Sequence, residues 1–353
     1  MANVDESVLK VLSAVTDEAL LQSDYEQISD WTYSNLDPIE YEGIAIRVPS
    51  LVRAAKVGRF PAMVVVHEEE PRLSELPLGD NCFIVAHDLV RGVSLETPCF
   101  LSPAEKIPLP PSMIKIPPPL PGAAPETSKT VVEFVDLRQS LGIGNKGGRY
   151  AVTAFSYNWV SNTAVTEVSD PKTERQRVHI QDAIAVMAIF SGSRTPSEER
   201  LPDYRKSPSS PSLSGLGAAL AVQGMYTQQS GRLPVHGAFS VEILDEWLVE
   251  PLTPDALGDL KPGDDTVYTR LPLAIVPALI VIARKGVPTP IMLDFKVPIM
   301  TDSGLKARDV IHGFFSVDLA AALPQTLPVG QHAVYLSIGP YVDGPYDLEV
   351  RPQ

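Results

Sequence analysis

The sequence has few cysteines and no long hydrophobic run, and both features limit what the protein can be. Cys82 and Cys99 are the only cysteines, and two thiols alone cannot build a tetrahedral zinc site. The most apolar stretch, "LPLAIVPALIVIA" from Leu271, is shorter than a membrane span and contains two prolines. We therefore expect no membrane insertion. We expect buried reduced thiols, with a disulfide as the alternative if the two cysteines lie on neighbouring strands.

Features of a secretory signal are also lacking. Residues 1–25 have no basic start, no unbroken apolar run and no small-residue cleavage site. We expect a cytoplasmic protein, with export by a route that needs no cleaved signal as the alternative. The formal net charge is −14, and a field of that sign repels phosphate backbones and anionic lipid. We therefore predict no nucleic-acid partner.

Proline is the residue type that the chain has in excess, with 34 among 353 residues. Proline interrupts helices and lies at turns and strand edges, so its abundance favours short strands and many loops. Runs such as "RYAVTAFSYNWV" from Arg149 and "QHAVYLSIGPYV" from Gln331 are rich in β-branched and aromatic residues. These patterns predict an all-β fold.

Part of the sequence recurs. Residues 135–168 align without a gap with residues 317–350 at an offset of 182, with 10 of 34 positions identical. In this block "VDLRQSL" aligns with "VDLAAAL", and "GRYAV" aligns with "GQHAV". A repeated order of packing and turn residues predicts an internal duplication.

A second block extends this repeat. Residues 26–66 align with 242–282 at an offset of 216, where Trp31 meets Trp247 and "PAMVVV" meets "PALIVI". We predict that the segment around each tryptophan is the first strand of its copy, and that both indoles anchor a core. We attribute the difference between the two offsets to a proline-rich insertion in the first copy.

We predict two tandem, related antiparallel β-sandwich domains of immunoglobulin-like size, preceded by an N-terminal amphipathic helix. The predicted boundaries are 1–23 for the helix, 24–170 for the first sandwich with its proline-rich insertion at 102–128, 171–237 for a linker with one ordered apolar element at 178–190, and 238–353 for the second sandwich.

The predicted helix carries an apolar stripe that includes Val8, Leu12 and Val15. An isolated helix of this length is marginal in water, so another surface must cover the stripe. The possible hosts are a groove between the two domains and a second chain, and we favour the second chain.

Several local motifs resemble chemical sites without completing them. "GIGNKGG" from Gly142 matches a dinucleotide-binding pattern, but a strand-like run follows it where a helix is needed. "HEEE" from His67 has Pro71 where a zinc-protease motif needs its second histidine. His236 and His312 both begin the pattern H-G-x-F-S-V-acid. The pattern indicates either paired metal ligands or histidines at strand edges or turns, and we favour histidines at strand edges or turns. We predict no catalytic residue, cofactor or metal.

Trp159 and Tyr341 occupy equivalent positions of the repeat, where they could form an aromatic platform or pack into a core. We predict a non-catalytic structural or protein-binding protein, a subunit of or accessory to a larger assembly, that binds a protein partner or itself. The candidate partner-binding residues are Val8, Leu12, Val15, Trp159 and Tyr341. The alternatives are a carbohydrate-binding module, with a glycan as ligand, and an enzyme or metalloprotein with an interdomain site.

Overall fold

A computed structural model describes most of the two predicted sandwich regions. The described residues are 4–22, 25–36, 39, 41–53, 59–68, 82–99, 129–143, 147–169, 204, 206–228, 231–250, 274–300 and 304–352. The predicted insertion at 102–128 and the predicted ordered element at 178–190 lie outside these residues.

Three helices precede the first set of strands, and a short helix lies within it. These elements are α1 (Glu6–Ala14), α2 (Asp17–Gln22), α3 (Tyr25–Leu36), β1 (Gly43–Arg47), β2 (Leu51–Arg53), β3 (Pro61–Glu68), β4 (Phe83–Asp88), β5 (Val93–Pro98), β6 (Lys129–Asp136), α4 (Leu137–Leu141), β7 (Gly148–Phe155) and β8 (Ala164–Ser169).

The second set of strands includes two short helical segments. Its elements are β9 (Gly217–Val222), β10 (Met225–Thr227), β11 (Pro234–Glu242), the 3-10 helix η5 (Asp245–Trp247), β12 (Ala274–Arg284), β13 (Ile291–Ile299), β14 (Val310–Asp318), α7 (Leu319–Ala322), β15 (Gly330–Ile338) and β16 (Tyr341–Arg351).

Each set of strands forms one three-stranded and one five-stranded sheet. We call β1-β3-β6 outer sheet 1, β2-β8-β7-β4-β5 inner sheet 1, β10-β16-β15-β12-β13 inner sheet 2 and β14-β11-β9 outer sheet 2. Neighbouring strands are antiparallel, except for the parallel pairs β2–β8 and β10–β16. The two halves thus share one topology, which confirms the all-β fold of two related tandem sandwiches. In immunoglobulin nomenclature this order is A-B-E and A′-G-F-C-C′.

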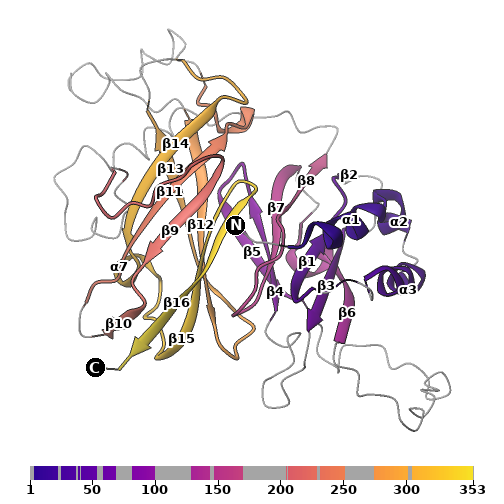
Figure 1. Ribbon diagram of the computed structural model, residues 1–353. Coiled ribbons are helices and arrows are strands. Elements are labelled where there is room, and N and C mark those ends of the chain that lie inside the picture. Colours follow the sequence, from indigo (N-terminus) through magenta and orange to yellow (C-terminus); the bar gives the residue numbers. More distant parts are fainter. Residues whose placement is uncertain are drawn as a thin grey trace.

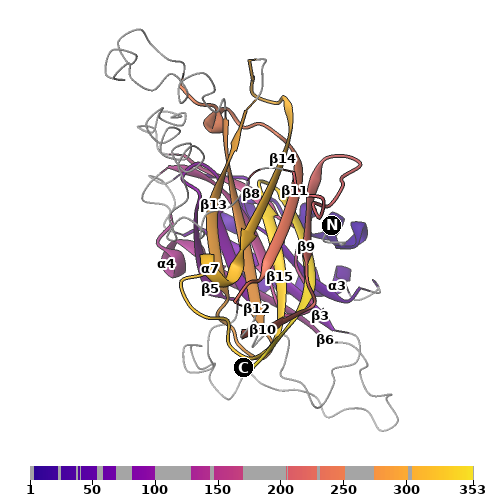
Figure 2. The ribbon, with the colours of Figure 1, turned by 90° about the vertical axis from the view of Figure 1, so that its left-hand side faces the viewer.

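The layers are stacked across the molecule (Figure 1). From one end to the other they are outer sheet 2, inner sheet 2, inner sheet 1, outer sheet 1 and the three N-terminal helices. Turning the molecule brings outer sheet 2 to the front, with the other sheets behind it (Figure 2). The two five-stranded sheets therefore face each other in the middle of the stack.

The duplicated "VDL" segment has the same structural role in both halves. Asp136 caps α4 and also accepts a hydrogen bond from the backbone N–H of Phe60 at 3.0 Å. Asp318 caps α7 and accepts from the backbone N–H of Leu233 at 2.8 Å. The leucine that follows each aspartate is fully buried. The offset of 182 residues therefore reflects real structural equivalence, because one carboxylate starts the helix and ties it to the neighbouring strand.

The predicted alignment of residues 26–66 with 242–282 is wrong. Its first part forms helix α3, not a strand, and Trp31 on that helix is 40% exposed whereas Trp247 is 1% exposed. The register makes β3 equivalent to β11, since Pro61 pairs with Asp136 as Pro234 pairs with Asp318. "PAMVVV" and "PALIVI" resemble each other because both strands are apolar on both faces. Because this alignment fails, the difference between the two offsets no longer indicates an insertion in the first copy.

The second sandwich begins earlier than predicted. β9, β10 and the start of β11 fall within the stretch 171–237 that we predicted as linker. β9 pairs with β11 over six residues, and β10 pairs with β16. The alternation of small residues in "GAALAV" at β9 gave too weak a pattern to distinguish this strand from a linker.

The N-terminal helices cover outer sheet 1. Val8, Leu12 and Val15 are buried in a cluster with strand residues on the outward face of that sheet: Ala45, Met63, Val65 and Val132. Both predicted hosts are therefore wrong: the stripe is covered by the same chain and not by a second one, and it lies on the outward face of the first sandwich and not in a groove between the domains. Continuous apolar runs give outer sheet 1 two apolar faces, and the second face needs a cover. Asp17 of α2 secures this contact by accepting hydrogen bonds from the backbone N–H and hydroxyl of Ser50.

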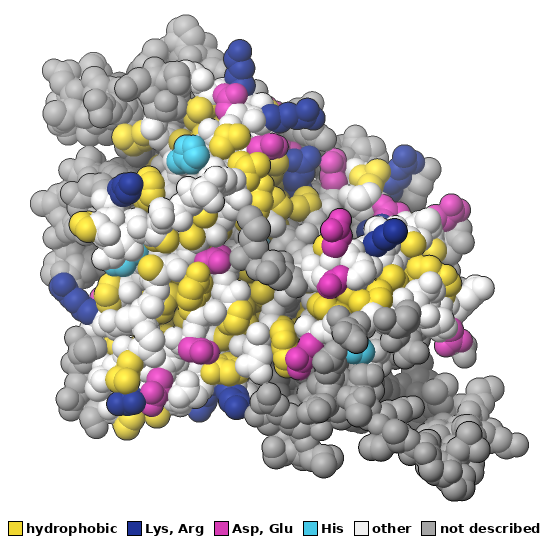
Figure 3. All heavy atoms as spheres, viewed as in Figure 1, with side chains coloured by type: hydrophobic (Ala, Val, Ile, Leu, Met, Phe, Trp, Pro, Cys, Tyr) yellow, Lys and Arg dark blue, Asp and Glu magenta, His cyan; other side chains and the backbone are white. Residues whose placement is uncertain are grey.

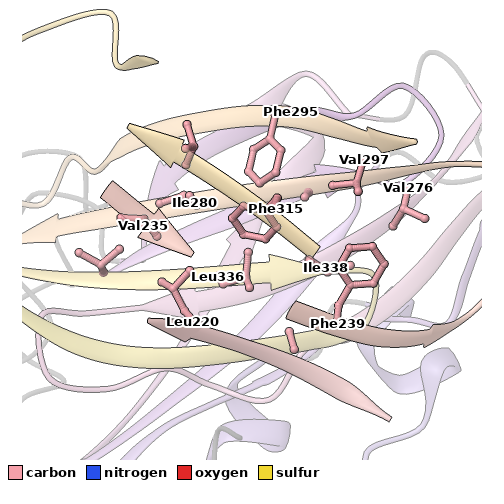
Figure 4. Close-up of a cluster of buried hydrophobic side chains, with 14 of the residues drawn as sticks. Leu220, Val235, Phe239, Val276, Ile280, Phe295, Val297, Phe315, Leu336 and Ile338 are labelled. Carbon is pink, nitrogen blue, oxygen red and sulfur yellow. The ribbon is translucent and has the colours of Figure 1, made fainter. Parts of the chain in front are cut away.

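The repeated H-G-x-F pattern builds the core of the second sandwich. β11 and β14 are antiparallel neighbours in which Gly237 lies opposite Phe315, and Phe239 lies opposite Gly313. A Cβ atom added to either glycine would lie 2.1 Å from the ring across from it. Each ring therefore lies over a glycine, and Phe239 and Phe315 both belong to the buried cluster of the second sandwich (Figure 4). His236 and His312 lie on the opposite, outward face of the same strands, since side chains alternate along a strand.

Candidate functional site

The contact between the two inner sheets brings together a buried apolar cluster and several polar side chains that can form hydrogen bonds. Its apolar part is a separate buried cluster of ten residues: Phe83, Val85, Phe155 and Val160 from the first sandwich, and Leu279, Val281, Ala283, Ala333, Tyr335 and Val342 from the second. Phe83 is equivalent to Leu279 and Val85 to Val281 in the strand registers. The two sandwiches thus pack through equivalent faces, as the subunits of a two-fold dimer do.

Hydrogen bonds fix the orientation of the two sandwiches. The hydroxyl of Tyr335 donates to the backbone oxygen of Ser156 at 2.7 Å, in the turn between β7 and β8. Trp247 Nε1–H donates to the backbone oxygen of Leu89 at 2.6 Å, in the turn between β4 and β5. The Tyr335 ring also meets the ring of Phe155 edge-on, with centroids 5.1 Å apart. Buried polar groups of this kind require one specific geometry.

Ser94, His87 and Asp294 form a polar cluster beside this apolar cluster. His87 lies on β4, Ser94 on β5 and Asp294 on β13, which belongs to the other sandwich. The Ser94 hydroxyl donates to Asp294 Oδ1 at 2.6 Å, and the Ser94 backbone N–H donates to Asp294 Oδ2 at 3.0 Å. His87 Nδ1 lies 2.8 Å from Ser94 Oγ and 3.6 Å from Asp294 Oδ1.

The cluster has the residue types of a hydrolase triad in a different arrangement. In a triad, histidine lies between serine and aspartate and contacts each through a different ring nitrogen. Here Ser94 donates its proton directly to Asp294, so its oxygen accepts from Nδ1–H of His87. His87 Nε2 is buried and has no hydrogen-bond partner among the residues that the structure describes. The imidazole therefore does not lie between the serine and the aspartate as it does in a triad, and the contacts of Ser94 with Asp294 link the two sandwiches.

The environment of Asp294 favours its charged form. Burial raises the pKa of the carboxyl group, but the neighbouring His87 imidazole and the hydrogen bonds from Ser94 outweigh burial and lower the pKa below its usual value of 3.8. A charged carboxylate accepting two hydrogen bonds from Ser94 is a strong and oriented contact. This contact joins strands that are 200 residues apart in the sequence.

The sequence-predicted site residues do not converge. Val8, Leu12 and Val15 lie under the helices at one end of the stack, as described above. Trp159 and Tyr341 lie in equivalent turns before β8 and at the start of β16, and each is half-buried against the core of its own sandwich. Each ring therefore has a packed side against its core and a partly exposed remainder.

Cys82 and Cys99 are brought together by the β4–β5 hairpin. Phe83 pairs with Pro98 at the end of this ladder, so the two cysteines occupy the next opposed position. The backbone N–H of Cys99 donates to the backbone oxygen of Cys82 at 2.9 Å. Both side chains are buried in the core of the first sandwich, and no disulfide joins them.

The outward face of outer sheet 2 differs from its helix-covered counterpart. Met63 and Val65 of outer sheet 1 correspond to His236 and Ala238 here, by the registers of β3 and β11. His236 Nδ1 lies 2.7 Å from Ser316 Oγ. The side of the molecule in Figure 3 mixes hydrophobic and polar side chains, and its basic side chains are scattered. His236 is thus a polar side chain at a position where outer sheet 1 carries the buried Met63.

The polar cluster of His87, Ser94 and Asp294 carries no local sequence signal. The strands that hold His87, Ser94 and Asp294 look like ordinary sandwich strands, so only the packing of the two halves reveals the cluster.

Within the described part of the chain, no group of three or more histidine, cysteine or acidic side chains is placed to hold a metal ion. No helix among the described residues is long and apolar enough to cross a membrane. Comparison with known families found no family model that matches this chain, and comparison with curated proteins found no match either.

Proposed function

We propose that this protein is a non-catalytic scaffold, a structural or protein-binding component of a larger assembly. The observation that carries the proposal is the face-to-face packing of the two inner sheets. Equivalent apolar positions from both sandwiches form one buried cluster there, and hydrogen bonds from Tyr335 and Trp247 orient it. A scaffold needs such a fixed relation between its two halves, because a partner that touches both must find them in register.

The features that recur between the halves also support this proposal. Asp136 and Asp318 cap helices and tie down strands. Gly43 and Gly217 both have left-handed φ values, of 145° and 155°, at the start of β1 and β9. What the duplication preserved is therefore packing and chain geometry, which is what selection for a scaffold retains.

The two alternative functions have less support. The carbohydrate-binding alternative relied on Trp159 or Tyr341 as exposed platforms, and both rings pack against their own cores. The alternative of an interdomain enzyme site relied on converging histidines and acids. His87 and Asp294 do converge, but the order of their contacts with Ser94 is that of a structural clasp.

The proposal can be tested by purifying the protein from its source and measuring native mass and metal content together. We expect an assembly of defined stoichiometry, heavier than the 38.2 kDa chain, without stoichiometric metal. Recombinant protein alone is the control, since its native mass separates self-association from binding of another chain. A source-purified monomer that carries one metal ion per chain would contradict the proposal and favour the metalloprotein alternative.

A further inference from the structure

We propose that Cys82 and Cys99 form a redox-active pair, able to join β4 and β5 through a disulfide within the first sandwich. The two residues face each other across the antiparallel ladder, one step beyond the pair Phe83 and Pro98. Directly opposed residues with a backbone hydrogen bond between them have Cα atoms about 5.5 Å apart. This Cα separation lies in the range found for disulfides, about 4.4–6.8 Å, so a small local adjustment of the two Cβ positions suffices to form the bond.

The directions of the two side chains fit the same bond. Both thiols enter the core cluster of the first sandwich and are 1% exposed, so their Cβ atoms lie on one face of inner sheet 1. Burial, together with the contact with Cys82, raises the pKa of the Cys99 thiol well above its usual value. The thiolate form is therefore rare in the folded protein, and the pair reacts slowly unless the hairpin opens.

The reaction is thiol–disulfide exchange with a low-molecular-weight disulfide such as oxidised glutathione. One protein thiolate attacks a sulfur of the oxidant and releases one glutathione thiol. The second protein thiolate then attacks the protein sulfur of the mixed disulfide and releases the second. The protein loses two hydrogens as two thiols become one disulfide, and the oxidant is reduced to two thiols.

The bond would close the hairpin where it meets two segments outside the described residues, 69–81 and 100–128. β5 is an edge strand of inner sheet 1, so a single partner strand holds it in that sheet. A covalent link at the open end of the hairpin would therefore hold this edge in place in an oxidising compartment.

The test uses the full chain, refolded from its reduced form in buffers with fixed ratios of oxidised to reduced glutathione. After acid quench and alkylation, intact mass and peptide mapping give the fraction with a Cys82–Cys99 bond. The same measurement in denaturant gives the equilibrium constant for disulfide formation in the unfolded chain, which is the reference. We expect the equilibrium constant for disulfide formation to be roughly a hundredfold larger in the folded chain than in the denatured chain. A disulfide that stabilises the folded chain must form more readily in it, and by thermodynamic linkage the two factors are equal.

Cys99→Ala and Cys82→Ala are the controls, and circular dichroism shows whether each of them folds. We expect either variant to give only mixed disulfides with glutathione, and a thermal midpoint that oxidant does not raise. Equal equilibrium constants in folded and denatured wild-type chain would overturn the proposal. Mixed glutathione adducts as the main folded product of the wild-type chain would overturn it as well.

Discussion

Replacing Val281 with aspartate should separate the two sandwiches while each stays folded. Val281 is fully buried in the apolar cluster between the two inner sheets and belongs to neither sandwich core. The variant loses about 2 kcal/mol of apolar burial. A carboxylate kept there without a partner would cost about 3–5 kcal/mol more. Opening the interface hydrates the charge, so the penalty falls on the contact between the sandwiches.

The assay for Val281→Asp is scanning calorimetry together with small-angle X-ray scattering. The wild-type chain should unfold in a single transition, and the variant in two, with a larger radius of gyration. Val329→Asp is the matched control, since Val329 is exposed and should leave both measurements unchanged. If Val281→Asp keeps the wild-type radius and the single transition, the interface does not hold the two sandwiches together as we describe.

Three further predictions concern single sites. Leu12→Ala should lower the free energy of unfolding by about 2–5 kcal/mol in urea titrations, whereas Leu51→Ala, at a 41% exposed position, should change it by less than about 0.5 kcal/mol. Gly237→Ala should cost about 1–3 kcal/mol, because the new methyl group overlaps the ring of Phe315, and Phe315→Leu in the same chain should recover part of the loss. The pKa of Asp294 is lowered on folding, so its contribution to stability is full above about pH 4 and is lost as the pH falls through the folded value. Asp294→Asn should remove that part of the acid dependence, measured as thermal midpoint against pH, and an unchanged profile would count against the clasp.

The sequence predicted those parts of the fold that depend on local interactions. The block with "VDL" could be aligned because Asp136 and Asp318 each act on a helix and a strand end close by. The H-G-x-F pattern was recognised as a repeat, but its meaning needed the pairing of β11 with β14, which brings each glycine under a ring.

Other parts depend on which surfaces meet, and sequence patterns do not encode that directly. The stripe on α1 showed that a cover was needed, but not that outer sheet 1 supplies it. The continuous run "PAMVVV" in β3 was the available signal, since a strand that is apolar on both faces needs a layer on each side. His87, Ser94 and Asp294 could not be grouped in advance, because two sandwiches must dock before β13 reaches β5.

If both sandwiches form one rigid scaffold, as we propose, the distance between their far ends is fixed. Spin labels at Lys10→Cys and His312→Cys test this most directly, by double electron–electron resonance. Both positions are exposed and lie toward opposite ends of the stack, on α1 and on the outward face of outer sheet 2, and the wild-type chain controls for labelling of the buried cysteines. We predict a single narrow distance distribution. A broad or multi-peaked distribution would show that the sandwiches move independently and would contradict the account.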